Sequence, residues 1–326
     1  MKNLNWAVLL LVSIAAMGME ALPEKPPIPA DNPMTPAKIA LGKKLYFDTH
    51  LSKTSTVSCS TCHLVTGKAT GVDNLQFSNG INGLKGGRNA PTVWNSAFNS
   101  VQFWDGRAAS LEEQAKGPLL NPVEMGMESH SHVMKRVAEN PAYVAEFKAV
   151  FGGENPVTID NLAKAIAAYE RTLITPDSPF DLFIRGDKKA LKPAAQRGMK
   201  LVQTIGCTSC HMGAMFSGPT LPAGQGFYMK FPTFPGTEYD KKYGFTKDLG
   251  RYEVTKKPQD KNMWRVASWR NVALTAPYFH NGSVETLDEA VRVMAKTQLG
   301  KDLKPKEVSD IVAFLESLNG KRPAQD

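Results

Sequence analysis

Apolar residues recur at helical spacing in three parts of the chain. The first part begins at Thr35-Pro36 and ends near Asp48, with proline in the first turn, where it is favoured. The second covers residues 159–172 and the third residues 306–318, and in each an apolar side chain returns every third or fourth position. These patterns predict three helices, each with one face directed at a core.

The same order of features occurs twice. The sequence LGKKLY at residues 41–46 has a counterpart in RGMKLV at residues 197–202, and a short cysteine motif follows each. A tract rich in glycine, proline and asparagine comes next, at residues 71–91 and 213–252, before an amphipathic helix closes each half. Such long loops need something to pack around. The repeat predicts a mainly α-helical chain with two helical domains and long irregular loops, and this order of helix, cysteine motif, loops and closing helix resembles the small cytochrome c fold.

The cysteine motifs indicate what the loops surround. Each motif reads C-x-x-C-H, and the two use all four cysteines of the chain. This spacing also occurs in zinc sites, disulfides and thioredoxin-like centres. Two copies, each followed directly by histidine, favour covalent attachment of two c-type haems, with the histidine as proximal ligand of each iron. The residues are Cys59, Cys62 and His63 in the first motif, and Cys207, Cys210 and His211 in the second.

The N-terminus has the pattern of a signal peptide, at residues 1–21. Lys2 precedes an apolar run that ends at Met17 and is too short to span a membrane. Several small residues offer cleavage points, and an uncleaved anchor is the alternative. Export to the periplasm is expected. After the signal peptide we expect an extended lead-in at residues 22–34, an N-terminal haem domain at 35–180 and a C-terminal haem domain at 181–326.

The net charge of +8 has a simple interpretation. Lysines and arginines are dispersed, and the chain contains no basic block of the kind that nucleic-acid-binding arms carry. We therefore expect a solvated surface and no nucleic-acid partner.

Two longer stretches make the sequence specific. RNAPTVWNSAFNSVQFWDGRAASLEEQAKGPLLNPVE occupies residues 88–124, and WRNVALTAPYFHNGSVETLDEAVRVM occupies residues 269–294. With both haem motifs, they make the chain similar to the bacterial dihaem cytochrome c peroxidases, a family related to MauG, from about Thr35 to the C-terminus. The resemblance implies a cytochrome-c peroxidase, a haem-dependent oxidoreductase that reduces hydrogen peroxide.

The resemblance assigns roles to three residues near the first haem. Peroxide cleavage needs an open iron position and a base that moves a proton between the two oxygens. Glu124 follows two prolines in a loop, and without the family it reads as a solvated charge. The resemblance makes Glu124 the acid/base, Gln114 its partner in the distal pocket, and Trp104 the aromatic residue between the haems.

Other family positions concern the second haem and a metal ion. Met294 matches the axial methionine, which would raise the potential of that haem and close its sixth position. Its competitors are Met212, Met215 and Met263. The family also implies a calcium ion between the domains, for which hard oxygen ligands are suitable. The matching positions are Asn89, Thr275 and Pro277.

One departure from the family concerns the loop ahead of Arg88. Many members carry a histidine there that caps the peroxidatic iron until the other haem is reduced, and Ile81 occupies its place here. The first haem is therefore expected to be open when oxidised. His130 and His132 are the alternative ligands.

The sequence therefore predicts a periplasmic dihaem peroxidase. Electrons from a small cytochrome c or cupredoxin would enter at the second haem, and a homodimer is expected from the family. The alternatives are a MauG-like protein-tryptophan oxidase, which has tyrosine where Met294 stands, and a dihaem electron carrier without an active site.

Overall fold

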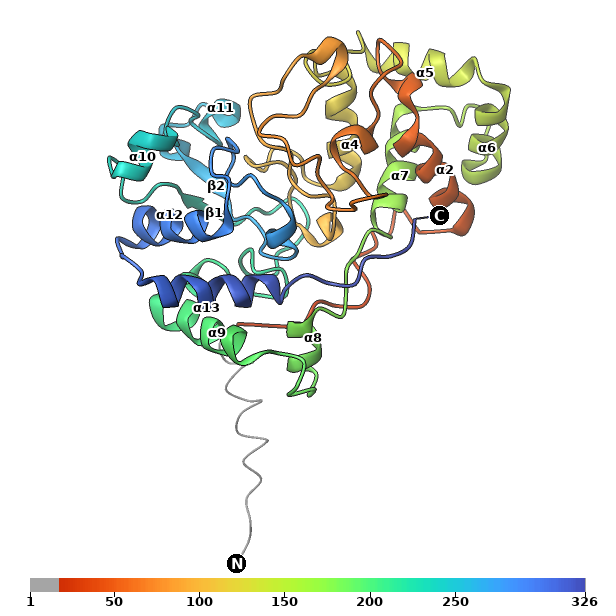
Figure 1. Cartoon of the computed structure of the whole chain (residues 1–326). Coiled ribbons are helices and arrows are strands. Elements are labelled where there is room, and N and C mark those ends of the chain that lie inside the picture. Colours follow the sequence, from red (N-terminus) through yellow and green to blue (C-terminus); the bar gives the residue numbers. More distant parts are fainter. Residues whose placement is uncertain (1–17, 326) are drawn as a thin grey trace, which may run out of the picture.

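The computed structural model describes residues 18–325 as a mainly helical protein in two halves (Figure 1). Most of the predicted signal peptide lies outside this range. The mainly α-helical fold expected from the sequence is confirmed, with one small antiparallel sheet. No helix among the described residues is long and apolar enough to cross a lipid bilayer. The helices are α2 (Pro36–Phe47), α3 (Cys59–Cys62), α4 (Leu111–Leu120), α5 (His130–Ala138), α6 (Pro141–Phe151), α7 (Ile159–Glu170), α8 (Pro179–Ile184), α9 (Pro193–Ile205), α10 (Glu238–Tyr243), α11 (Tyr252–Thr255), α12 (Leu287–Leu299) and α13 (Pro305–Glu316), and the strands are β1 (Tyr228–Lys230) and β2 (Met263–Arg265).

The three helices expected from hydrophobic spacing are α2, α7 and α13. Thr35 caps α2 by accepting a hydrogen bond from the backbone N–H of Lys38, and Pro36 occupies the first turn. Thr158 caps α7 in the same way. The observed ends of α7 and α13 differ from the predicted ends by one or two residues, because the last turns fray into bends.

A close crossing of two helices organises each half. In the first half α2 crosses α7, and in the second half α9 crosses α13. A Cβ atom on Gly42 would lie 1.9 Å from the carbonyl oxygen of Ala165, and one on Gly198 would lie 1.9 Å from that of Asp310. The two crossings therefore have the same geometry, and glycine is what lets the helix backbones meet.

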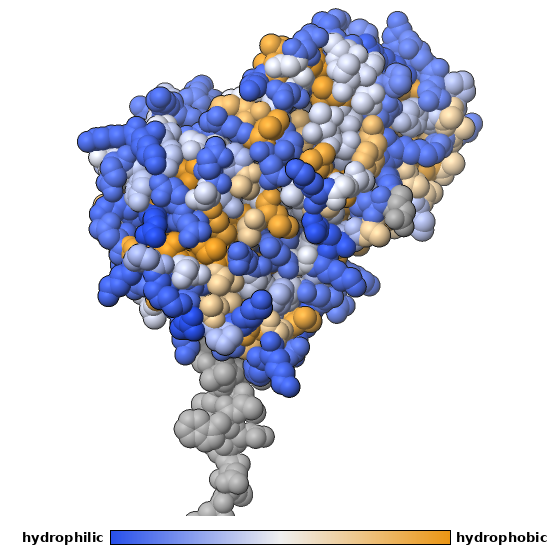
Figure 2. All heavy atoms as spheres, viewed as in Figure 1, coloured by the Kyte–Doolittle hydropathy of each residue, from blue (hydrophilic) through white to orange (hydrophobic). Residues whose placement is uncertain are grey.

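Each crossing has its own hydrophobic core. The first core includes Tyr46 and Tyr169, whose rings pack edge to face at 5.1 Å. The second includes Phe180, Phe216 and Phe314 in a similar arrangement. A third cluster fills the space around β1, β2 and α12. Hydrophilic residues cover most of the face shown in Figure 2, and hydrophobic residues appear there in separate patches.

The segment between the halves contains a short helix, α8. Phe180 of this helix is fully buried in the second core. Asp181 forms an ion pair of 2.8 Å with Arg270, and both side chains are buried. The segment is thus packed against the second half.

Both ends of the described chain cross between the halves (Figure 1). Met19 is buried in the second core, and Leu22 donates its backbone N–H to Asp181. The lead-in then reaches the first half, where Asn32 bonds to Glu112. At the other end, Gln325 accepts a hydrogen bond from the hydroxyl of Tyr169. Two extended segments therefore connect the halves in addition to the segment around α8.

We predict that Gly42→Ala and Gly198→Ala each lower the free energy of unfolding by ~1–3 kcal/mol, because the added methyl group forces the crossing helices apart. Urea unfolding measures the effect. Gly117→Ala is the matched control, since Gly117 also lies within a helix but its Cβ would meet the ring of Phe103 at an ordinary 3.5 Å. Equal stability of all three variants would contradict the role of the crossings.

Candidate active site

Two cavities lie beside the two cysteine motifs. The first cavity, of about 420 Å³, has Cys59, Cys62 and His63 in its wall. The second cavity, of about 270 Å³, has the cysteines and histidine of the second motif, including His211. Each motif thus faces a space of its own, which suits the bulky cofactor that the sequence predicts.

The thiols in these walls are neutral and free. Burial raises the pKa of Cys59 to about 12 and that of Cys62 to about 11. None of the four cysteines forms a disulfide in the described chain, and residues 18–325 hold no cluster of three or more His, Cys, Asp or Glu arranged around a metal ion. Neutral thiols beside a large apolar cavity fit covalent attachment of a porphyrin.

His211 is oriented as a haem ligand must be. Its Nδ1 lies 2.9 Å from the carbonyl oxygen of Phe216, and a carbonyl only accepts, so Nδ1 carries the proton. The imidazole stacks on Trp269 with ring centroids 4.3 Å apart. Burial lowers the pKa of His211 to about 4, which keeps the ring neutral. Nε2 is left with a free lone pair for a metal.

The backbone of His63 is held in place by a side chain of α2. Its carbonyl oxygen accepts a hydrogen bond of 2.8 Å from the hydroxyl of Tyr46 on α2. Burial lowers the pKa of its imidazole as well. The helix crossing of the first half therefore also positions the predicted iron ligand.

Glu124 and Gln114 both line the first cavity with His63. Gln114 lies on α4, which begins at the capping residue Ser110. Glu124 accepts a hydrogen bond of 2.7 Å from the side chain of Asn121. Burial raises the pKa of Glu124, and the positive charge of Arg107 opposes this rise. The structure thus gathers the predicted acid/base and its partner at one cavity; their catalytic roles stay predictions.

Arg107 is a charged residue of this cavity that sequence reasoning missed. Its guanidinium stacks on the ring of Phe103, 3.5 Å from the centroid, and pairs with Asp105 at 2.9 Å. Among the described residues it is the one positive charge that lowers the pKa of Glu124. Nothing in the sequence connects Arg107 with Glu124, and only the fold brings the two to the same cavity.

Trp104 forms part of the wall of both cavities. Its indole N–H donates to the carbonyl oxygen of Asn89 at 2.8 Å. Its own carbonyl accepts the backbone N–H of Arg265 at 2.9 Å, so the second half holds it too. Trp104 therefore stands between the two spaces, where the sequence predicted an inter-haem residue.

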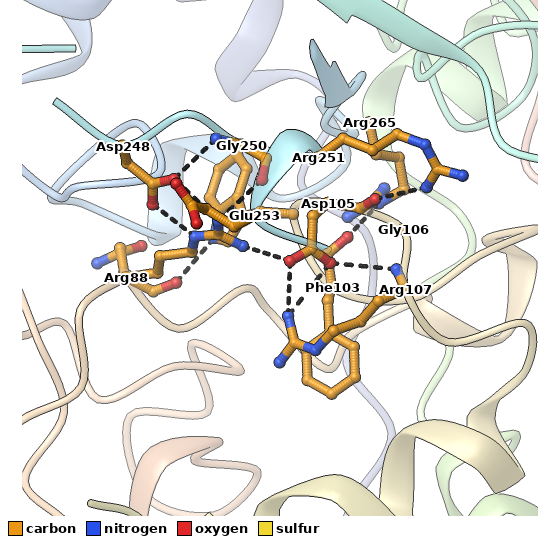
Figure 3. A network of polar contacts seen from close by, with 12 residues as sticks. Arg88, Phe103, Asp105, Gly106, Arg107, Asp248, Gly250, Arg251, Glu253 and Arg265 are labelled. Atoms are coloured by element: carbon orange, nitrogen blue, oxygen red, sulfur yellow. Dashed lines mark hydrogen bonds and ion pairs between the residues drawn. The ribbon is translucent and has the colours of Figure 1, made fainter. Parts of the chain in front are cut away.

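A network of ion pairs fixes the segment around Trp104 (Figure 3). Asp105 is buried and pairs with Arg88 at 2.6 Å. Arg88 also pairs with Asp248 of the second half at 2.7 Å, and Arg251 donates to the carbonyl of Asp105 at 2.9 Å. These residues, with Arg107, form the Arg88–Asp105 network, which joins the two halves next to Trp104.

Met294 lies on α12 and lines the second cavity with His211. Of its competitors, Met215 lines this cavity too, whereas Met212 and Met263 are not among the lining residues. The structure narrows the candidates for the axial position to side chains at the cavity, and the assignment to Met294 stays a prediction.

Arg265 is a second cation that the sequence did not single out. It lines the second cavity, donates from Nε to the carbonyl of Phe103 at 3.2 Å, and forms no ion pair with a carboxylate within residues 18–325. Burial lowers its pKa to about 10. A guanidinium of this kind suits a carboxylate group on a cofactor.

The three residues matched to a calcium site lie together in the wall of the second cavity. Asn89 donates its side-chain N–H to the carbonyl of Leu75 at 2.9 Å, so its Oδ1 is the atom left to bind a cation. Thr275 and Pro277 lie beside it in the same wall. One amide oxygen and backbone carbonyls are donors that a hard cation accepts. Calcium stays a prediction here.

Ile81 is buried and is not among the residues that line the first cavity. Its backbone N–H donates to the carbonyl of Glu124 at 2.9 Å. Its side chain covers Gly126, where an added Cβ would lie 2.2 Å from the Ile81 Cδ1. Two histidines that the sequence left as alternatives, His130 and His132, bond to Lys116 and Glu128 and do not line this cavity either.

His280 had no role assigned from the sequence. It is buried, lines the second cavity and stacks on Trp264 with centroids 4.0 Å apart. Its carbonyl accepts the backbone N–H of Asn89 at 2.8 Å. The residue therefore ties the loop of the first half to the wall of the second cavity.

Comparison with known proteins agrees with this geometry. The model of the family described as di-haem cytochrome c peroxidase matches residues 36–189. The cytochrome c551 peroxidase of Pseudomonas aeruginosa is 47% identical over 89% of this chain and 81% of its own length. The cytochrome c peroxidase Ccp of Escherichia coli is 45% identical over 90% of this chain, which spans 60% of that protein.

A solved structure extends the comparison to the fold. The crystal structure of a MauG-like protein associated with microbial copper homeostasis covers 98% of this chain and 96% of its own, with a TM-score of 0.79 and 28% identity. The expectation drawn from the two C-x-x-C-H motifs and the segments around Trp104 and His280 is confirmed at the level of the family. The chain belongs to the di-haem cytochrome c peroxidase family.

Proposed function

We propose that this chain is an exported dihaem peroxidase that reduces hydrogen peroxide at the first cavity with electrons received at the second. The observation that carries the proposal is the position of Trp104 in the wall of both cavities, with Glu124 in the first and Met294 in the second. The relatives named as cytochrome c peroxidases support the activity.

Haem attached through the two cysteine motifs would supply irons that accept and donate electrons. The chain's own residues do the rest at the first cavity. Glu124 takes a proton from one oxygen of hydrogen peroxide and returns it to the other, and Gln114 orients the molecule by hydrogen bonding. Arg107 favours the ionised form of Glu124 that this first transfer requires. Overall, two electrons and two protons convert one peroxide to two waters.

The second cavity has a different task. In this proposal His211 and Met294, which line the cavity together, would both ligate the haem iron, which would then store electrons and would not react with peroxide. The donor is a small cytochrome c or cupredoxin in the periplasm. A calcium ion bound by Asn89, Thr275 and Pro277 would stiffen the wall near Trp104. The functional unit is a homodimer.

Ile81 supports a further part of the proposal: the first haem site would bind peroxide without prior reduction of the second haem. In many family members a histidine at this place caps the iron. Here the side chain is buried over Gly126, and the backbone is bonded to the loop that carries Glu124. The loop is therefore packed in a position that leaves the first cavity free.

A MauG-like oxidation of a partner protein is the second candidate function, supported by the likeness to the MauG-like structure. Met294 at the second cavity favours the peroxidase. Steady-state turnover of hydrogen peroxide with reduced cytochrome c separates the two functions and also tests the electron carrier, which would show no turnover.

We predict that Glu124→Gln lowers kcat by about 10²–10⁴-fold, because the amide cannot carry the proton between the peroxide oxygens. Peroxide turnover is measured together with haem content, which stays unchanged. Glu128→Gln is the control, since Glu128 is an exposed carboxylate four residues away that pairs with Lys53 and His132 on the surface. Unchanged kcat in Glu124→Gln would remove Glu124 from the mechanism.

The pH dependence of the peroxidase activity follows from the carboxyl group of Glu124. Glu124 must be ionised to act as a base, so activity falls as the pH drops through its pKa, which burial places above the ordinary value of 4.5. Arg107 lowers this pKa, and we predict that Arg107→Gln moves the acid limb of the kcat/KM profile to higher pH. A limb that stays in place would show that Arg107 does not act on Glu124.

We predict that the oxidised wild type shows one high-spin haem by EPR and needs no prior reduction, because the side chain at position 81 packs over Gly126 and does not line the first cavity. For the same reason, oxidised Ile81→His should keep one high-spin haem. Ile81→Val keeps the packing over Gly126 and should behave like the wild type. Two low-spin haems in the wild type would contradict the open site.

A further inference from the structure

Glu170, the last residue of α7, is a buried acid with no role in the mechanism above. Its side chain lines the first cavity, and the residue is 7% exposed. Its Oε2 is buried without a hydrogen-bond partner. Burying an ionised carboxylate without a hydrogen-bond partner costs free energy. Because buried polar atoms normally have such a partner, the unpaired oxygen in this cavity wall points to a bound group that would supply one.

The position equivalent to Glu170 in the second half of the chain carries an apolar residue. The crossings at Gly42 and Gly198 align Ala165 with Asp310 and Tyr169 with Phe314. The next residues are Glu170 in the first half and Leu315 in the second. Leu315 is buried and lines the second cavity, as Glu170 lines the first. The two halves therefore differ in charge at one equivalent position of the cavity wall.

The groups around Glu170 do not neutralise it. Arg171 is committed to Glu112 on α4, with contacts of 2.7 and 3.1 Å, and Glu112 repels a charge on Glu170. Burial raises the pKa of Glu170 to about 8 in spite of Arg171. The other titratable groups that interact with it are Tyr46 on α2, Tyr169 on α7 and the Cys59 thiol on α3.

Glu170 shares the first cavity with the predicted point of haem attachment. Both Glu170 and Cys59 line this cavity, and a negative charge on Glu170 raises the pKa of the Cys59 thiol. The carboxyl group would therefore line the space that a haem held by this cysteine would occupy. A charge there is felt by the iron, because the interior screens it poorly.

We propose that Glu170 is a proton-holding acid of the first haem site, which takes up one proton when the site gains one electron and releases it when the electron is lost. The inference rests on the proposed assignment of the first cavity to haem. It gives the peroxide site a second titrating group besides Glu124 and explains why only this half has an acid where Leu315 stands.

Redox titrations of the whole holoprotein between pH 6 and 10 test the proposal. In the wild type the lower-potential wave, that of the haem without methionine, should fall with pH around the Glu170 transition, approaching about 59 mV per unit for one proton and one electron. Glu170→Gln should lose this slope. The wave of the second haem is the internal control and should not change.

Glu170→Leu introduces the residue that the second half has at the equivalent position, Leu315. This variant distinguishes a structural role of Glu170 from the proposed uptake of a proton. We expect it to fold at least as stably as the wild type, since a buried acid is replaced by an apolar side chain, and to lack the slope. An unchanged slope in both variants would overturn the proposal while leaving the peroxidase assignment intact. A protein with fewer than two haems by pyridine haemochrome assay would overturn the proposed function, and this inference with it.

Discussion

The close contact between crossing helices is the constraint on which the rest of the structure depends. Where Gly42 meets α7 and Gly198 meets α13, the backbones approach to a separation that any side chain would prevent. Tyr46 next to the first crossing bonds to the backbone of His63, so the same contact that closes the core also orients a predicted iron ligand. Each cavity is thus built against a rigid pair of helices, and its irregular loops need only complete the wall.

The relation between the cavities depends on a different force, which is electrostatic. Asp105 is buried between Arg88 and Arg107, and Arg88 reaches across to Asp248. Buried ion pairs add little net stability, but removing one partner leaves a charge without compensation, so the arrangement is held in one geometry. Trp104 is adjacent to this network and takes its position from it. The first cavity is rich in ionisable side chains, and the second in thioether and aromatic side chains.

Much of this could be predicted from the sequence because the signals were local. Helical periodicity located α2, α7 and α13, and two five-residue motifs pointed to the two segments that line the cavities. The family resemblance selected Glu124 and Gln114, and the fold places both in the wall of the first cavity. Arg107, Arg265 and Glu170 could not be predicted, because their importance comes from which distant groups they face. The short helix α8 could not be predicted either, because the expected domain boundary between residues 180 and 181 falls inside it, and Pro179 occupies its first turn.

The two ends of the described chain lend the molecule a property that neither half has alone. The lead-in runs from the second core to the first, and the tail runs from α13 back to Tyr169 (Figure 1). Together with the segment around α8, three stretches of backbone cross the junction. Hinge motion between the halves is therefore restrained by one covalent connection and by two chain ends that packing and hydrogen bonds hold in place. The separation of the two cavities is then set by the fold, and in the proposed peroxidase the rate of electron transfer between them would be governed by driving force and protonation.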